Sequence, residues 1–162
     1  MANRGFAVDA VDISTTAIEM AKEIALIKGL MINFRVQDLL ELSKLEKKYD
    51  LILANYCLQS IVTDEDRKKL FSIVSSGLKD TGYYIIASAY IIKLEVIKIV
   101  IMIQIRVLHM IRFRTLKAAT LINGEWWLPH RRHLKKDVLR EELQAAGFKV
   151  VFHEDGNLIL KI

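Results

Sequence analysis

Three polar residues, Asp12, Asp38 and Asn55, each stand at or just after the end of a short apolar segment. In an open parallel sheet, ligands bind at the carboxyl ends of the strands, so these positions are candidates for a binding site. A carboxylate at position 12 could accept hydrogen bonds from both hydroxyls of a ribose, which predicts a nucleotide site. The alternative is an aspartate that caps the following helix, and the sequence supports both interpretations about equally.

Histidine and aromatic residues in the second half of the chain are further candidates. Histidine titrates near neutral pH and can serve as a general base. Aromatic side chains can line a substrate pocket. The candidates are His109, His130 and His133 for the base, and Tyr90, Trp126 and Trp127 for the pocket. Surface histidines and aromatic core packing are the favoured alternatives, so the sequence identifies no catalytic residue.

The elements that would position these residues alternate between strands and helices. Strand patterns occupy residues 6–13, 32–36, 49–54, 83–90, 149–153 and 158–162. Helical spacing runs from Ser14 or Thr15 to Gly29, from Asp64 to about Leu78, and from His133 to Ala146. This alternation predicts an α/β fold with a parallel sheet covered on both faces, followed by a C-terminal antiparallel strand pair.

Residues 91–117 carry two conflicting patterns. Their charged residues fall within one arc of a helical wheel, which favours an amphipathic helix. Ile and Val dominate the middle of the segment and partly alternate, which is typical of a strand. We expect a helix, with a strand as the alternative.

Length and composition limit the class of protein. A chain of 162 residues with 52% apolar residues predicts a single packed domain. One cysteine, Cys57, excludes an internal disulfide framework and a cysteine-cluster zinc site, and we expect a small buried residue there. The first residues do not resemble a signal peptide, and the most apolar stretch, residues 85–111, is interrupted by charges. These features favour a cytoplasmic protein without a transmembrane helix.

The net charge of +5 is concentrated in the second half, mainly between Lys93 and Lys136. Such a region could bind an acidic substrate, a phosphate-bearing partner or an anionic surface. A solvated basic face is the favoured interpretation. Without a recognisable nucleic-acid motif, no nucleic-acid partner is expected.

Five segments in this order resemble one known family. They are NRGFAVDAVDIS, AIEMAKEIA, NFRVQDLLEL, KKYDLILANYCLQSI and LREELQAAGFKVVFHEDGNLILKI. They resemble class I S-adenosylmethionine-dependent methyltransferases, most closely small bacterial ones of the tellurite-resistance and related types. The likeness covers residues 1–90 and 131–162, and residues 91–130 stand where this family carries a variable insertion after its fifth strand. A nicotinamide-binding Rossmann domain shares the acid at Asp12 but not usually the QDL segment or the terminal hairpin.

The resemblance implies a set of cofactor-binding residues. The matching positions are Asp12, Ile13, Asp38, Leu39, Asn55 and Tyr56. In the family, the acid matching Asp12 binds the ribose of S-adenosylmethionine. The residue matching Asp38 meets the adenine amino group, and the one matching Leu39 offers its backbone N–H to the ring. Asn55 and Tyr56 match positions beneath the methionine part and the reacting methyl group. No metal site is implied.

The sequence departs from the family at its beginning. The family opens with a strand, a glycine-rich loop and a helix, whereas the seven glycines here include no pair with the required spacing. Residues 3–6 resemble the exit of that helix, so Met1 is expected to fall inside the family domain. A Rossmann-like doubly wound sheet lacking its first strand and helix would expose two strand edges. We therefore expect the chain to close the gap or to form a homo-oligomer through these edges.

The resemblance predicts transfer of a methyl group from S-adenosylmethionine to a small-molecule acceptor. Two alternatives remain at this stage. One is a non-catalytic remnant that acts as a binding or oligomerisation module. The other, less favoured, is a peripheral membrane or nucleic-acid binder that uses the basic region.

Overall fold

The computed structural model describes residues 1–88, 120–122, 125–127, 131–132, 134–154 and 157–162. The helix expected at residues 91–117 lies outside these ranges, as does most of the expected insertion at 91–130. The chain forms two compact units, Met1–Ser43 and Lys44–Ile162. Each is described by itself. None of the helices in the described ranges is long and apolar enough to cross a membrane.

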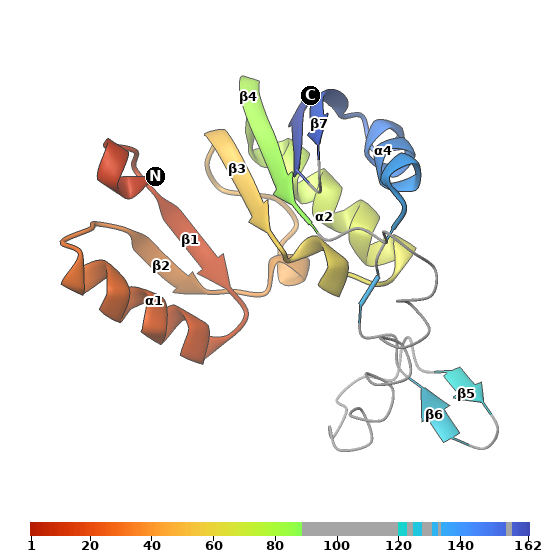
Figure 1. The fold of residues 1–162 in the computed structure, drawn as a ribbon, viewed down its shortest axis with the longest axis horizontal. Helices are drawn as coiled ribbons and strands as arrows, with labels where there is room; N and C mark the ends of the chain where they lie inside the picture. Colours follow the sequence, from red (N-terminus) through yellow and green to blue (C-terminus); the bar gives the residue numbers. More distant parts are fainter. Residues whose placement is uncertain (89–119, 123–124, 128–130, 133, 155–156) are drawn as a thin grey trace. The chain divides into compact units, whose positions relative to one another are not determined.

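The first unit is a strand–helix–strand motif (Figure 1). Its elements are η1 (Ala2–Arg4), β1 (Asp9–Asp12), α1 (Thr15–Ile27), β2 (Asn33–Val36) and η2 (Leu39–Glu41). β1 and β2 are parallel, and their register runs from Asp9 opposite Asn33 to Asp12 opposite Val36. Parallel strands joined through a helix are the arrangement that the sequence predicts for this region.

The ends of α1 follow from its capping residues. The Ser14 side chain accepts a hydrogen bond from the Ala17 N–H at 3.2 Å, as an N-cap residue does. Gly29 has a φ of 61°, a left-handed conformation that suits glycine and ends the helix. The predicted helix is therefore confirmed. The first strand is shorter than the predicted 6–13, because β2 offers only four residues to pair with β1.

The second unit contains a four-stranded sheet in the order β3-β4-β8-β7 (Figure 1). Its elements are β3 (Tyr49–Asn55), η3 (Leu58–Ser60), α2 (Asp64–Gly77), β4 (Leu78–Ala87), α4 (Lys136–Ala145), β7 (Lys149–Glu154) and β8 (Asn157–Lys161). β3 and β4 are parallel, while β8 is antiparallel to both of its neighbours. The predicted α/β fold and the C-terminal antiparallel pair are confirmed.

Two boundaries differ from the prediction. β4 begins at Leu78 rather than at Tyr83, because Leu78 pairs with Tyr49 before an irregularity in the register. Gly82 lies in this irregularity, where a Cβ atom would come 3.0 Å from the Tyr49 carbonyl oxygen. α4 begins at Lys136 rather than at His133, since Lys135 has an extended backbone with a ψ of 152°.

A short hairpin was not predicted. β5 (Thr120–Ile122) and β6 (Glu125–Trp127) pair in antiparallel register, with Thr120 opposite Trp127. The sequence between them is Asn123-Gly124. This dipeptide is the strongest local signal for a two-residue hairpin loop, and it was available from the sequence.

The core of the second unit lies between α2, α4 and one face of the sheet. Alternate residues of β4 and β8 are buried on this face: Tyr84, Ile86, Leu158 and Leu160. The Phe148 ring lies 5.5 Å from the Tyr84 ring and 6.2 Å from the Phe71 ring of α2, measured between centroids. Elsewhere on the sheet, Leu53 and Tyr83 are 51% and 37% exposed.

Candidate functional site

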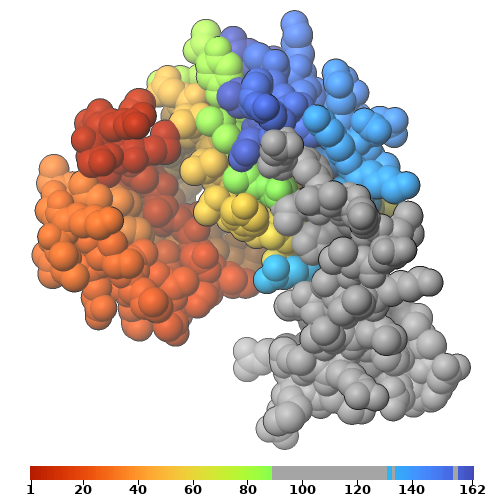
Figure 2. Space-filling view, viewed as in Figure 1, coloured from red at the N-terminus to blue at the C-terminus, as the bar shows by residue number. Residues whose placement is uncertain are grey.

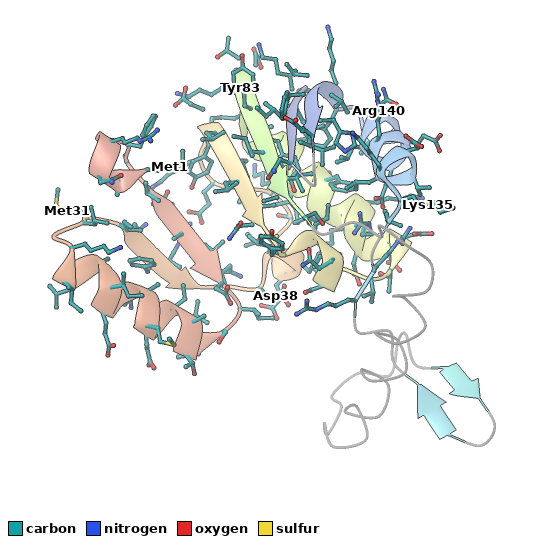
Figure 3. All side chains as sticks on the ribbon, viewed as in Figure 1. Met1, Met31, Asp38, Tyr83, Lys135 and Arg140 are labelled. Carbon is teal, nitrogen blue, oxygen red and sulfur yellow. The ribbon has the colours of Figure 1, made fainter. Side chains whose placement is uncertain are left out.

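The first unit brings Asp12 and Asp38 to the same end of its two strands. β1 and β2 are parallel, and Asp12 pairs with Val36, two residues before Asp38. The Gln37 N–H donates a hydrogen bond to the Asp12 carbonyl oxygen at 2.9 Å, which fixes this end of the pair. Asp38 is labelled in Figure 3. Two carboxylates therefore stand at the carboxyl edge, where an open parallel sheet binds ligands.

The Asp12 side chain also has a local role. Its Oδ1 atom accepts a hydrogen bond from the Ser14 N–H at 2.8 Å, at the entrance to α1. This is the helix-capping alternative, and the structure shows that Asp12 does contribute to the start of the helix. The residue is nevertheless exposed, as is Ile13 beside it, at 69%. An exposed carboxylate can accept further hydrogen bonds from a ligand.

Asp38 begins the turn of helix η2. Its Oδ1 atom accepts a hydrogen bond from the Leu40 N–H at 2.8 Å, and its carbonyl oxygen accepts one from the Gln37 side chain at 2.9 Å. Leu39 is the first residue of η2. The first N–H groups of a helix have no acceptor within it, so the Leu39 N–H suits an aromatic ring nitrogen of a ligand.

The second unit places Asn55 and Tyr56 at the carboxyl end of β3. Asn55 pairs with Ala87 of β4, and the Tyr56 N–H donates to the Ala87 carbonyl oxygen at 2.8 Å. Tyr56 has a φ of 53°, and it alone among the non-glycine residues of the described ranges has a positive φ. Its side chain is 59% exposed. Such a conformation is costly for tyrosine and is often found at binding sites.

The loop after Tyr56 contains polar residues that sequence reasoning did not select. Gln59 is only 3% exposed, and its Oε1 atom accepts a hydrogen bond from the Ser88 hydroxyl at 3.3 Å. Ser88 directly follows β4. A cavity of about 10 Å³, with room for about one water molecule, lies here, and Gln59, Ser88, Arg67 and Arg132 contribute to its wall. The signal for Gln59 was its place in the loop after a strand, but no spacing rule indicated its burial.

Arg132 joins this loop from a distant part of the sequence. Its backbone N–H donates to the Gln59 carbonyl oxygen at 2.7 Å, and its guanidinium forms an ion pair with Asp64. The hydrogen bond from Arg132 lowers the pKa of the Asp64 carboxyl below its usual value. Both side chains are partly or largely exposed, so this pair contributes little to stability.

Several predicted residues lie outside the description. Tyr90, His109, His130 and His133 fall in undescribed ranges, and for Trp126 and Trp127 only the backbone of β6 is described. Most of the basic region from Lys93 to Lys136 is also undescribed. Among the described residues, no group of three or more His, Cys, Asp or Glu side chains could hold a metal ion.

The expectation that Cys57 is buried is wrong, because its side chain is exposed. It follows the left-handed Tyr56 and precedes η3, in a loop beyond the end of β3.

Comparison with solved structures finds the same fold in methyltransferases. A methyltransferase from Methanosarcina mazei is 18% identical over 99% of this chain and 84% of its own, with a TM-score of 0.69. An S-adenosylmethionine-dependent methyltransferase from Clostridium acetobutylicum ATCC 824 is 18% identical over 97% and 75%, with a TM-score of 0.66. TehB from Haemophilus influenzae is 12% identical over 99% and 51%, with a TM-score of 0.61. Comparison with curated proteins finds no match.

The TM-scores of these structures show that the fold is shared. The family is shown by the sequence itself. The model of the methyltransferase domain family matches residues 1–82, half of the 162-residue chain. This range contains Asp12, Asp38, Asn55 and Tyr56, the residues that the structure places at strand ends. The resemblance of the sequence to class I methyltransferases is thus confirmed, and the chain belongs to the methyltransferase domain family.

Proposed function

We propose that this chain binds S-adenosylmethionine and transfers its methyl group to a small-molecule acceptor. One observation carries the proposal: the parallel register of β1 and β2 puts an exposed Asp12 carboxylate beside the Asp38–Leu39 turn. These groups fit an adenosine, because a carboxylate can accept from ribose hydroxyls and a free helical N–H can donate to adenine.

Asp12, Ile13, Asp38 and Leu39 would hold the adenosine part of the cofactor. Asn55 and Tyr56 would hold the methionine part, and the left-handed backbone of Tyr56 supports a binding role. When bound, the sulfonium supplies an activated methyl group that an acceptor nucleophile can take. The contribution of the protein would be mainly orientation of the two reactants, so no catalytic residue is assigned.

A small-molecule acceptor is inferred from the resemblance of the sequence to small bacterial methyltransferases of the tellurite-resistance type. A cytoplasmic location belongs to the same proposal and rests on the single cysteine, with cell fractionation as its test.

The proposal is tested by calorimetric titration with S-adenosylhomocysteine. We expect micromolar binding by the parent chain and a loss of about tenfold or more in Asp12→Ala, since a hydrogen bond to a charged group contributes about 1.5–3 kcal/mol. Asp9→Ala is the matched control: it removes a carboxylate from the other end of β1, where Asp9 accepts from the Asn33 side chain. No binding by a folded parent chain, or equal losses in both variants, would reject the assignment of Asp12.

A binding module without catalysis is the second candidate. The observation that favours it is the sequence, whose seven glycines include no Gly-x-Gly pair to cradle the methionine end of the cofactor. A folded chain that binds neither S-adenosylhomocysteine nor S-adenosylmethionine would favour this candidate.

We also propose that two copies of the chain pair through β3. Among the described strands, β1 pairs only with β2 and β3 only with β4, so each presents one open edge. Antiparallel pairing of two β1 strands would set Asp9 opposite Asp12 of the second copy, which like charges oppose. Two β3 strands centred on Ile52 would set Leu51 opposite Leu53 instead, with no like charges facing.

Light scattering on eluting protein tests this pairing. Leu53→Lys should convert a dimer to a monomer, because Leu53 is 51% exposed on the open strand and the lysine would face apolar side chains of the second copy. Val151→Lys, at a 54% exposed position on β7, is the control and should leave the dimer intact. A monomeric parent chain would rule out the pairing.

A further inference from the structure

Arg67 is a buried cation in α2, with only 1% of its surface exposed. Its Nε and Nη2 atoms each donate to one carboxylate oxygen of Glu142 in α4. The Phe71 ring lies beside it, with its centroid 5.7 Å from the guanidinium carbon. One edge of the planar guanidinium, with Nε and Nη2, thus joins the two helices that cover the sheet.

The other side of the same guanidinium binds the loop after the candidate site. Its Nη1 atom donates to the Leu58 carbonyl oxygen at 2.9 Å and to the Ile61 carbonyl oxygen at 3.2 Å. Leu58 is the first residue of the turn η3, Ile61 directly follows its last residue, and η3 begins two residues after Tyr56. The Leu58 carbonyl also accepts from the Ile61 N–H at 3.2 Å, so losing Arg67 would remove one of two donors to an acceptor in a residue that is 1% exposed.

The loop is held from a second side as well. The Arg132 N–H binds the Gln59 carbonyl oxygen, and Ser88 binds the Gln59 side chain. Residues 57–63 therefore have anchors on α2, at the end of β4 and at Arg132. A left-handed backbone conformation at a tyrosine persists only where the surrounding structure holds it in place. The contacts that anchor residues 57–63 therefore also help to hold Tyr56 in this conformation.

A purely stabilising role does not explain this arrangement. Replacing a buried ion pair by apolar side chains of similar size is often neutral or favourable for stability. The geometric specificity of the pair is more informative, because a planar guanidinium can bind a carboxylate and two carbonyls in fixed directions at once.

We propose that Arg67 is a positioning residue that fixes the loop of residues 57–63 and thereby sets Asn55 and Tyr56 for the cofactor. This inference rests on the proposed function. Glu142 orients Arg67, and Arg67 holds the loop of residues 57–63. A residue of α4 thus acts on Asn55 and Tyr56 through Arg67 and this loop. Arg67 itself does not touch the cofactor.

The test is the double variant Arg67→Met/Glu142→Leu, which removes both charges and replaces them with apolar side chains. We expect a melting temperature within about 4 °C of the parent. Amide hydrogen exchange at residues 57–63 should become about tenfold faster or more, with the sheet unchanged. Affinity for S-adenosylhomocysteine should fall about tenfold.

The matched control is Asp50→Asn/Lys79→Gln. Asp50 and Lys79 form an ion pair between β3 and β4 with both side chains largely exposed, and removing it leaves the net charge unchanged in the same way. It should change neither loop exchange nor affinity. Should the apolar double variant fail to fold, Arg67→Lys replaces it, since one ammonium cannot serve Glu142 and both carbonyls, and loop exchange must rise there too.

Unchanged exchange at residues 57–63 in the folded variant overturns the proposal, as does faster exchange with undiminished affinity. If the parent chain does not bind S-adenosylhomocysteine, the cofactor assignment fails by itself. Amide hydrogen exchange at residues 57–63 then shows by itself whether Arg67 holds this loop: faster exchange in the variant means that it does.

Discussion

The two units of the chain differ in how many of their apolar side chains are buried. In residues 1–43 only Ile18 and Ala25 are buried apolar residues, whereas residues 44–162 bury a continuous set from α2, α4, β4 and β8. On α1, Met20, Ile24 and Ile27 recur at helical spacing and are 58%, 52% and 84% exposed. The surface of α1 appears in orange in Figure 2. Met31, at 92% exposure, points away from its unit in Figure 3.

This difference shows that secondary structure and burial have separate requirements. One helix lying on two strands can cover only one stripe of itself and one face of the strands. The sequence of the first unit carries more apolar side chains than three elements can bury. The second unit has two helices on a four-stranded sheet, which is enough to form a core. Most of the free energy of unfolding should therefore come from the second unit.

The largest expected contrast is between two leucines near helix ends. Leu143 in α4 is 0% exposed, so Leu143→Ala should destabilise the protein by about 2–5 kcal/mol, through lost burial and a cavity. Leu26 in α1 is 82% exposed, and Leu26→Ala should change stability by less than about 0.5 kcal/mol. Urea unfolding measures both. A cost above ~1.5 kcal/mol for Leu26→Ala would mean that a partner or a second copy covers α1 in solution.

Amide hydrogen exchange sharpens the comparison without any substitution. Amides of α1 and β2 should exchange at least about tenfold faster than those of β4 and β8, because local opening costs less where few apolar contacts break. The parent chain is measured alone and with S-adenosylhomocysteine. Protection that rises in the first unit on adding the ligand would agree with a site at Asp12 and Asp38. Equal protection in the two units of the free chain would contradict the contrast.

The sequence predicted most elements because their signals are local. Ser14 and Gly29 mark the ends of α1, and the apolar segments before Asp12, Asp38 and Asn55 predicted that each stands at or just after the carboxyl end of its strand. The sequence predicted a sheet covered on both faces, yet Val11 and Ile13 of the strand predicted at residues 6–13 are 37% and 69% exposed. Burial depends on neighbouring elements, which a local pattern does not contain.

The contacts that hold the loop after Tyr56 could not be predicted from the sequence, for a related reason. Arg67 and Glu142 are 75 residues apart, and nothing in either local sequence indicates the other. The left-handed Tyr56 was equally hidden, since tyrosine is not a residue that favours a positive φ. Its position was selected through resemblance to a family, and its conformation became visible only in the structure.

Helix caps give a smaller contrast between the units. Thr63 accepts from the Asp66 N–H and donates to the Asp66 carboxylate, at the start of a helix that buries Leu70 and Phe71. Thr63→Ala should cost about 1 kcal/mol and lower the main melting temperature by about 2–4 °C. Ser14→Ala removes the cap of α1 and should leave that transition unchanged while speeding exchange in α1. A shift of the main transition in Ser14→Ala would show that the two units unfold together.

The smallest expected effect is a dependence of stability on pH in the second unit alone. Burial, followed by the nearby charges of Lys136 and Arg140, lowers the pKa of His153 below its usual 6.5, while Asp137 opposes the shift. The unfolded chain then binds more protons than the folded chain as the pH falls through 6.5, so stability is lost in that direction. Residues 1–43 contain no histidine.

Unfolding of the parent chain and of His153→Gln between pH 7.5 and about pH 5.5 measures this effect, and the variant also separates His153 from the other three histidines. The parent should lose stability over this range, and the variant should lose less. Exchange in α1 should not change with pH beyond the intrinsic chemical rate. An equal loss of stability in parent and variant would assign the pH dependence to groups other than His153, and a response of α1 would show that protonation in the second unit reaches the first.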